Sequence, residues 1–313
     1  NNRTQIYPRI ETESIPGRQL PKICRDDNPD VIIPDMRKSS EIYYFLLDYC
    51  KSNKINLIHV TSPDPCINIF QLISLKLNIP IISIYHTDVL SYLKVSNKKW
   101  YEIYLAWAMH FTHAYNLLDC FSTTSPVMAK KIREYSFYPK KKPIWIVPIS
   151  IDTELFKPAT CKYDSFWEKD TTKLLYVGRV TTEKSIERII NSMDDSMSLI
   201  IIGEGGATDS LSKLANESGE RKKVKFIDTI DQSELPYWYS SADIFVMPSS
   251  TETLGFVTLE AMSCGLPVCG FADGGTLDII ENNVNGILFK TNEELKQSIN
   301  KIITDDEFKL NIV

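Results

Sequence analysis

The sequence predicts an α/β protein with parallel, buried strands arranged in two domains. Short apolar runs rich in β-branched residues alternate with longer amphipathic stretches, which is the pattern of βαβ units. The chain has 313 residues and is 43% hydrophobic, so it is long enough for two separate cores. Glycine is also unevenly distributed, because Gly17 is the only glycine before Gly178. Backbone conformations that favour glycine are therefore expected mainly in the second half of the chain.

The apolar runs predict strands, and the amphipathic stretches between them predict helices. The strands are expected at Val31–Ile33, Leu57–Val60, Ile81–Tyr85, Ile144–Val147, Leu174–Val177, Leu199–Ile202, Val224–Ile227, Ile244–Met247 and Val268–Phe271. The helices are expected to include Ser40–Ser52, Cys66–Leu77, Lys98–Leu117, Lys184–Asp194, Leu211–Glu217 and Glu293–Thr304. A turn flanked by prolines at Pro148–Pro158 interrupts the alternation. We therefore expect an N-terminal domain over residues 1–150 and a C-terminal domain over residues 151–313.

Charge and cysteine usage indicate the environment and the partners of the chain. The net charge is −5, but residues 1–150 carry 19 Lys+Arg against 13 Asp+Glu, and residues 151–313 carry 16 against 27. An anionic surface should therefore meet the N-terminal half, and we do not expect nucleic acid as a partner. Seven scattered cysteines without a CxxC pair indicate a reducing compartment, so we expect a cytoplasmic protein.

The glycines of the second half predict where a phosphate group binds. A backbone that approaches a phosphate closely favours glycine, which has no Cβ and tolerates positive φ. Ligands of open α/β sheets bind at the carboxyl ends of the strands. The candidate glycines each follow a predicted strand, and they are Gly178, Gly203, Gly205, Gly206 and Gly255.

The segment SADIFVMPSSTETLGFVTLEAMSCGLPVCGFADGG, residues 241–275, predicts a strand, a loop, a helix and a second strand. Glu252 lies in the loop, and Glu260 lies just over one turn inside the helix, where it can accept hydrogen bonds from a diol such as a ribose. The first N–H groups of a helix lack intrahelical partners and favour an anion. These groups belong to Gly255, Phe256 and Val257.

The same segment resembles family four of the retaining glycosyltransferases. The Glu-x7-Glu pattern from Glu252 to Glu260, the AMSCGLPV that follows, and Gly274–Gly275 carry the resemblance. It extends through LLYVGRVTTEKSIERII, IIGEGGATDSL and FIDTIDQSELPYWYSSADIFVMPS, and into the first half through LIHVTSPD and SIYHTDVLSYL. It covers about residues 28–310 and is nearest to enzymes that transfer sulfoquinovose or mannose to glycerolipids. The resemblance implies a GT-B fold, in which two Rossmann-like domains face a cleft, with the donor on the C-terminal domain.

The resemblance implies roles for individual residues. Arg179 and Lys184 would neutralise the donor diphosphate as it becomes the leaving group. Glu252 would bind hydroxyls of the transferred sugar, and Glu260 would bind the ribose. His86, in the YHTD turn, would approach the donor sugar, so the implied catalytic set is His86, Arg179, Lys184 and Glu252. Backbone contacts to the phosphates, the sugar and the base would come from Gly178, Ile230, Gly255, Phe256 and Val257.

The implied reaction is the retaining transfer of a sugar from a UDP- or GDP-sugar to a lipid or glycan hydroxyl. The leaving diphosphate would help to deprotonate the acceptor, and neither a metal nor another cofactor is expected. Two departures from the family pattern stand out. No glycine-rich loop precedes Gly17, so the first strand and that loop are expected to be missing, and Ser150 replaces a usual glycine in ISID.

Other interpretations of these residues stay open. Glu252 and Glu260 can be a loop carboxylate and a helix surface residue, and His86 can be a hydrogen-bonded core histidine. Arg179 and Lys184 can be solvated charges near a helix start. A nucleotide-sugar epimerase or hydrolase of the same fold would share the donor site. A non-catalytic subunit that binds a nucleotide sugar would also share it.

Basic and aromatic residues of the first half suggest contact with a membrane surface. The predicted helix Lys98–Leu117 carries several aromatic residues, and Lys94–Lys99 and Lys130–Lys142 supply positive charge. Amphipathic aromatic residues beside lysines suit a headgroup region. We expect reversible, peripheral binding to anionic membranes. The alternative is a solvated basic face without a membrane role.

Overall fold

The computed structural model describes residues 17–19, 32–34, 39–60, 67–86, 88, 118–134, 142–160, 163–217 and 223–313. The contacts divide the chain into two compact units, residues 1–81 and residues 82–313. The domain boundary predicted near residue 150 lies inside the second unit and stays a prediction.

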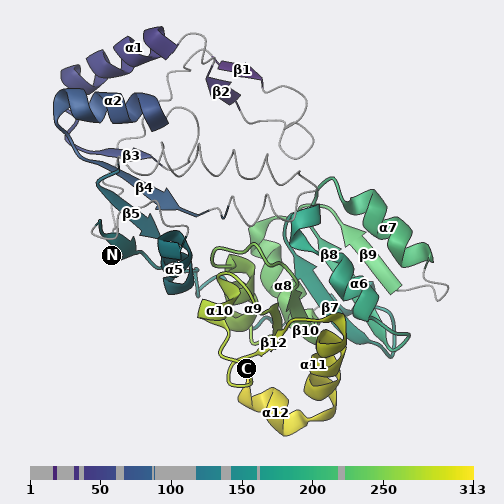
Figure 1. The fold of residues 1–313 in the computed structure, drawn as a ribbon. Coiled ribbons are helices and arrows are strands. Elements are labelled where there is room, and N and C mark those ends of the chain that lie inside the picture. The colour runs from purple at the N-terminus through teal and green to yellow at the C-terminus, as the bar shows by residue number, and fades with distance from the viewer. Residues whose placement is uncertain are drawn as a thin grey trace. The chain divides into compact units, whose positions relative to one another are not determined.

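The first unit contains the elements at the start of the chain (Figure 1). Strand β1 (Gly17–Gln19) pairs antiparallel with β2 (Ile32–Pro34). Helices α1 (Ser39–Ser52) and α2 (Ile67–Leu77) pack against each other, and β3 (Ile58–Val60) lies between them in the chain. The apolar pattern did not predict β1, because the strand reads GRQ and carries no apolar side chain.

A four-stranded sheet has the strand order β3-β4-β5-β6. Strands β4 (Ile81–Tyr85), β5 (Cys120–Thr123) and β6 (Ile144–Ile146) pair in parallel, and helix α5 (Pro126–Glu134) follows β5. Strand β5 was not predicted from the apolar pattern, since half of its residues are polar. Its hydroxyl groups are nevertheless buried, because Ser122 and Thr123 donate hydrogen bonds to backbone carbonyls of β4.

The second unit holds a six-stranded sheet in the order β12-β11-β10-β7-β8-β9, with parallel pairing along the sheet. The strands are β7 (Thr172–Val177), β8 (Met197–Ile202), β9 (Lys223–Ile227), β10 (Ile244–Met247), β11 (Val268–Phe271) and β12 (Ile287–Phe289). Strands β8 and β9 lie on one side of β7, and strands β10, β11 and β12 lie on its other side. The strand order therefore reverses between β7 and β10, and such a switch point is where open α/β sheets bind ligands.

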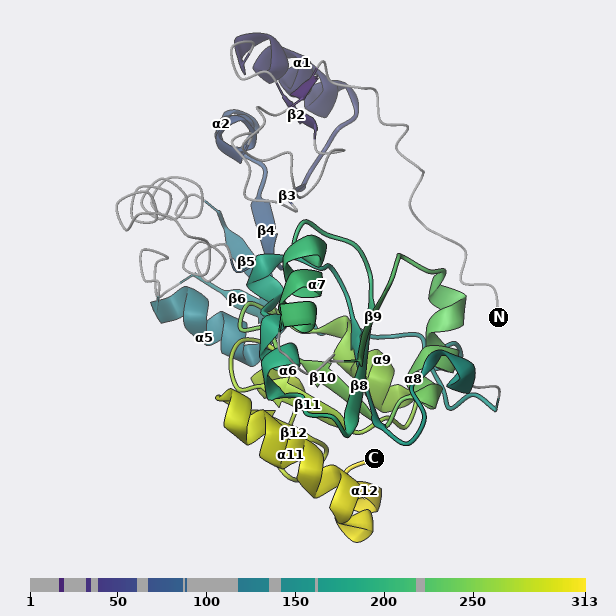
Figure 2. The same ribbon diagram turned by 90° about the vertical axis from the view of Figure 1, so that its right-hand side faces the viewer.

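Helices cover both faces of this sheet (Figures 1 and 2). Alternate residues of β7 point to opposite faces, so Leu174 and Tyr176 join one core, and Leu175 and Val177 join the other. The first core is closed by α6 (Glu187–Ser192), α7 (Thr208–Glu217) and α11 (Asn292–Thr304). The second is closed by α8 (Leu235–Ser241) and α9 (Phe256–Ser263). The short helices α10 (Thr276–Ile279) and α12 (Asp306–Asn311) complete the unit.

The fold-class prediction is confirmed, since two parallel sheets of α/β character are present. The predicted helix Lys184–Asp194 is wrong at its start. The chain forms a 3-10 turn at Thr182–Lys184, adopts a left-handed conformation at Ser185 (φ 54°), and begins α6 only at Glu187. The predicted helix Lys98–Leu117 lies outside the described residues. None of the helices that the structure describes is both long and apolar enough to span a bilayer.

Candidate donor site at the strand switch point

The loops after β7 and β10 carry most of the predicted site residues. These strands are adjacent and parallel, with Ile244 beside Leu174, so the two loops leave the sheet at the same edge. The loop after β7 contains Arg179 and Lys184, and the loop after β10 contains Glu252. The fold therefore brings side chains separated by about 70 residues to one end of the sheet.

An ion pair joins these two loops. Lys184 Nζ lies 2.5 Å from Glu252 Oε1, and the two side chains are only 15% and 14% exposed. The 3-10 turn places Lys184 ahead of α6 instead of inside a helix. Lys184 is therefore not a solvated charge, and Glu252 is a loop carboxylate that is paired with it.

Arg179 has a different environment from Lys184. Its guanidinium Nη2 lies 3.3 Å from Glu183 Oε1; the Arg179 side chain is 62% exposed, whereas the Glu183 side chain is 8% exposed. The Tyr176 hydroxyl donates a hydrogen bond of 2.9 Å to the carbonyl oxygen of Arg179. Burial, together with the nearby charges of Glu252 and Glu183, raises the pKa of Tyr176 well above its ordinary value. Tyr176 therefore remains a protonated donor that holds the backbone of the arginine loop.

The glycines after β7 and β8 allow these two loops to approach each other. Gly203 has a φ of 134°, and a Cβ there would lie 2.1 Å from the carbonyl oxygen of Gly178. At Gly205 a Cβ would lie 2.1 Å from the carbonyl oxygen of Val180. Loop packing thus accounts for both glycines, which the sequence had suggested as phosphate-binding candidates.

The start of α9 provides donors that suit an anion. Gly255 has a φ of 92° and precedes the first helical residue, Phe256, as expected. No described residue accepts a hydrogen bond from the N–H groups of Gly255, Phe256 or Val257. The buried Thr258 hydroxyl, 3.4 Å from where a Cβ of Gly255 would lie, also lacks a partner among the described residues. Four donors are therefore unused where the helix dipole favours negative charge.

Glu260 is a buried residue, so its interpretation as a helix surface residue is wrong. It is 7% exposed, and its Oε2 accepts a hydrogen bond of 2.9 Å from the Tyr239 hydroxyl. Burial raises the pKa of Glu260, while the bond from Tyr239 acts in the opposite direction. Sequence reasoning missed Tyr239, because this residue lies in α8, 21 positions earlier, and nothing in the local pattern connects the two.

Gly274 and Gly275 shape the loop that carries Glu252. Gly274 has a φ of 59°, and a Cβ there would lie 2.4 Å from the carbonyl oxygen of Glu252. At Gly275 a Cβ would lie 2.3 Å from the carbonyl oxygen of Thr253, and its N–H donates a 2.7 Å hydrogen bond to the carbonyl oxygen of Glu252. The glycine pair of the motif therefore supports the loop that carries Glu252 by close backbone packing.

Gly274→Ala should lower the free energy of unfolding by about 1–3 kcal/mol, because the methyl group forces the Glu252 carbonyl to move. Gly265→Ala is the matched control: its φ is also positive, at 71°, but the added Cβ would make only ordinary contacts, the nearest at 3.6 Å. Urea denaturation of both variants measures the difference. Equal losses would show that the positive φ alone, and not contact with the Glu252 loop, makes Gly274 necessary.

His86 is exposed and follows β4, so it is not a core histidine. Its carbonyl oxygen accepts a 2.8 Å hydrogen bond from the Thr253 hydroxyl, and the Thr253 carbonyl accepts a 3.1 Å bond from Thr124. The backbone of His86 thus lies beside the residue that follows Glu252. Ile230 is half-buried against the core that contains α8 and α9, and its contact with a base stays a prediction.

Several cations of the expected membrane face are used within the protein. Lys131 lies 3.4 Å from the buried Asp88 and 3.2 Å from Asp273. Arg133 donates to the carbonyl oxygen of Lys142, whose own Nζ donates to a backbone carbonyl, both at 2.6 Å. Lys130 is 79% exposed. The remaining lysines of that face, Lys94, Lys98, Lys99, Lys140 and Lys141, lie outside the described residues.

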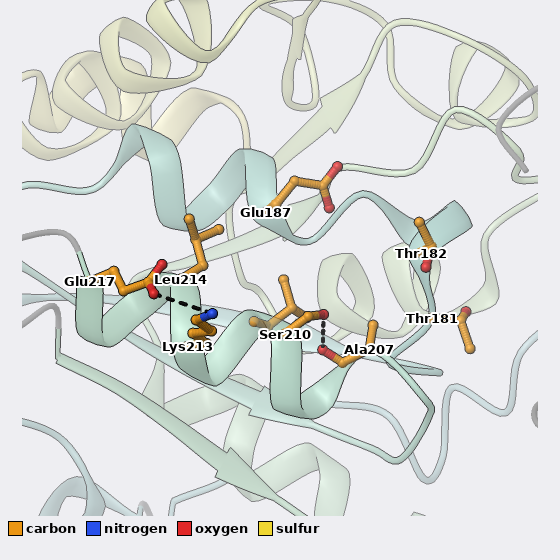
Figure 3. A pocket seen from close by; sticks show the side chains of 9 residues that line it. Thr181, Thr182, Glu187, Ala207, Ser210, Lys213, Leu214 and Glu217 are labelled. Atoms are coloured by element: carbon orange, nitrogen blue, oxygen red, sulfur yellow. Dashed lines mark hydrogen bonds and ion pairs between the residues drawn. The ribbon is translucent and has the colours of Figure 1, made fainter. Parts of the chain in front are cut away.

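A cavity of about 400 Å³ lies between the turn before α6 and helix α7 (Figure 3). Its lining, all from described residues, is Thr181, Thr182, Glu187, Ala207, Ser210, Leu211, Lys213, Leu214 and Glu217. This set includes none of the predicted site residues. The cavity is therefore lined in part by the loop that contains Lys184 but does not include the Lys184–Glu252 ion pair.

Two family models match this chain and together cover most of it. The model described as "Glycosyl transferases group 1" matches residues 162–313, and "Glycosyltransferase Family 4" matches residues 17–155. Two curated relatives align over 74% of this chain: the sulfoquinovosyl transferase SQD2 of Arabidopsis thaliana, 31% identical, and the GDP-mannose-dependent alpha-mannosyltransferase of Corynebacterium glutamicum, 25% identical. The chain spans 46% and 55% of their respective lengths.

The fold is similar to that of Anabaena Alr3699/HepE, solved in complex with UDP-glucose. That structure has a TM-score of 0.71 and 18% sequence identity, and the match covers 87% of this chain and 74% of that chain. At this level of identity the similarity concerns the fold alone.

Proposed function

This chain belongs to the GT-B glycosyltransferases of family four, and we propose that it transfers a sulfoquinovose- or mannose-like sugar from a nucleotide-sugar donor to an acceptor hydroxyl, with retention at the anomeric carbon. The carrying observation is the Lys184–Glu252 pair at the switch point of the six-stranded sheet. One partner suits a diphosphate and the other suits sugar hydroxyls. Such a pair is expected where the bond between sugar and diphosphate breaks.

Arg179 and Lys184 neutralise the leaving diphosphate in this proposal, together with the unused donors at the start of α9. Cations and backbone N–H groups that are already in place stabilise developing negative charge without reorganisation. When the donor binds, Lys184 turns toward the phosphates and Glu252 toward the sugar hydroxyls. This exchange of partners keeps both charges satisfied, and it requires no metal ion.

Glu260 and His86 complete the proposed site. Tyr239 occupies one oxygen of the Glu260 carboxylate, which leaves the other for the ribose hydroxyls. The exposed His86 approaches the donor sugar, and the leaving diphosphate accepts the proton of the attacking hydroxyl. UDP is the first choice of donor nucleotide and GDP is the second, as the names of the relatives and of the fold neighbour include both kinds.

A transfer assay separates this proposal from its alternatives. The protein is incubated with UDP- or GDP-sugars labelled in the sugar, with and without a diacylglycerol acceptor. We expect labelled product only when acceptor is present. An isomerised donor without acceptor would identify an epimerase, free labelled sugar would identify a hydrolase, and donor binding without turnover would identify a non-catalytic subunit.

We further propose a lipid acceptor reached from an anionic membrane surface. Beyond the basic charge of residues 1–150, the exposed apolar side chains of Trp145, Ile146 and Val147 support this proposal, at 55%, 48% and 48% exposure. They follow the basic segment that ends at Lys142. Aromatic and apolar side chains beside lysines favour a headgroup interface.

Changing Lys140, Lys141 and Lys142 to Gln should reduce binding to phosphatidylserine vesicles at least about 5-fold at low salt, since each basic residue contributes about 1 kcal/mol at such a surface. The effect should fade as salt shortens the Debye length, which is about 8 Å at physiological ionic strength. Co-sedimentation measures the bound fraction. The matched control changes three exposed lysines of the acidic half, Lys157, Lys169 and Lys290. Equal binding by both triple variants, or none by the wild type, would instead favour a soluble acceptor.

A further inference from the structure

Glu183 is a buried carboxylate that the proposed reaction does not use. Its side chain is 8% exposed, and its Oε1 has no hydrogen bond among the described residues, although the Arg179 guanidinium lies 3.3 Å away. An ion pair with a mostly exposed cation adds little stability, and burying the carboxylate costs desolvation, so stability alone is a poor reason for this pair. The position of Glu183 therefore calls for another explanation.

Both cations of the proposed donor site are paired with carboxylates, but the two pairs differ. Lys184 and Glu252 come from two different loops, and their side chains are buried to a similar extent. Glu183 lies beneath an arginine that is 62% exposed. A buried carboxylate cannot easily turn toward a substrate, whereas an exposed guanidinium can contact one while it keeps its partner.

Two contacts hold the backbone here, one at Glu183 and one at Arg179. Glu183 lies in the 3-10 turn Thr182–Lys184, and its carbonyl oxygen accepts a hydrogen bond from the Thr251 hydroxyl of the loop that carries Glu252. On the other side, the Tyr176 hydroxyl holds the carbonyl of Arg179 at 2.9 Å. The backbones of Arg179 and Glu183 are therefore each contacted by a side chain of a neighbouring element.

We propose that Glu183 is a positioning residue, whose carboxylate aligns the Arg179 guanidinium for the donor diphosphate. This inference rests on the proposed function. Without the carboxylate, a mostly exposed arginine side chain samples many rotamers, and ordering it again on binding costs conformational entropy. The negative charge also repels the diphosphate, but Arg179 lies against it and screens it. We therefore expect the loss of alignment to exceed the relief of repulsion.

Titration calorimetry with UDP, GDP and uridine tests this inference in the full chain. Glu183→Gln keeps the side-chain shape and should weaken binding of the preferred diphosphate about 10-fold, with uridine binding and the thermal unfolding midpoint little changed. Glu187→Gln is the matched control, because it removes a carboxylate from the first turn of α6 that, within the described part of the chain, pairs with neither Arg179 nor Lys184. It should leave diphosphate affinity within about 2-fold.

The decisive comparison repeats Glu183→Gln in an Arg179→Ala background. A positioning residue acts through the arginine, so the loss should disappear there. The same loss in both backgrounds, parallel loss of uridine binding, or tighter diphosphate binding by Glu183→Gln would overturn the inference. A wild type that binds neither UDP nor GDP would overturn the proposed function as well. A wild type that binds, is weakened by Arg179→Ala and is unaffected by Glu183→Gln would overturn the positioning role alone.

Discussion

Glu252→Gln is expected to lower kcat at least about 100-fold and to weaken donor affinity less than about 10-fold. The carboxylate should bind the sugar hydroxyls more tightly as the ring gains positive charge, and an interaction made mainly in the transition state affects turnover. Glutamine retains the shape but loses the charge and the ion pair with Lys184. The freed lysine remains available to the diphosphate, so donor affinity is largely preserved.

Single-turnover rates and calorimetric donor affinities, measured on the same preparations, separate these two effects. Glu281→Gln, an exposed carboxylate of the same half of the chain, serves as the control and should change neither. If Glu252→Gln turned over at the wild-type rate, Glu252 would have no catalytic role. If it lost affinity and turnover equally, its role would be to bind the ground state.

Lys184→Ala is expected to weaken binding of the donor diphosphate by about 1.5–3 kcal/mol, roughly 10- to 150-fold, which corresponds to a charge-assisted hydrogen bond. The change also leaves Glu252, which is 14% exposed, without its cation. An unpaired carboxylate near the phosphates adds repulsion to the loss of attraction. We therefore expect the larger end of this range at low ionic strength.

Uridine or guanosine provides the internal control for this variant, because neither carries phosphate. Lys173→Ala provides the external control. Lys173 lies near the start of β7, at the opposite end of that strand from the loop that carries Arg179, and its Nζ forms an ion pair of 2.6 Å with Asp164. Equal losses for the nucleoside and the diphosphate would show that Lys184 has a structural role only.

The regular part of the C-terminal half was predictable because its central strands, such as β8 and β10, are buried on both faces. Continuous apolar runs gave the positions of β10 and β11 to the residue. Strand β5 was missed because buried hydroxyl groups there are satisfied by the neighbouring strand, which local hydrophobicity does not report. The break before α6 was missed because Ser185 adopts a left-handed conformation that its residue type does not favour.

Candidate site residues could be predicted where they belong to a sequence motif. Side chains from distant elements that contact them could not. The motif indicated Glu252, Gly255 and the start of α9, and the structure brings Lys184 to Glu252. Tyr239 and Tyr176 contact site residues through packing between elements, and no sequence spacing reports such contacts. The roles of all these site residues toward a donor, including those of Ile230 and His86, stay predictions.

The most direct test of the proposed donor site is a thermal-shift panel of the wild type with UDP, GDP, ADP and the matching nucleosides. A ligand that binds only the native state raises the unfolding midpoint by mass action. We expect UDP or GDP to raise the midpoint at concentrations where its nucleoside does not, and we expect the shift to be lost when Arg179 and Lys184 are both changed to Ala. No shift with any diphosphate, or equal shifts with nucleoside and diphosphate, would contradict a nucleotide-sugar site at this edge of the sheet.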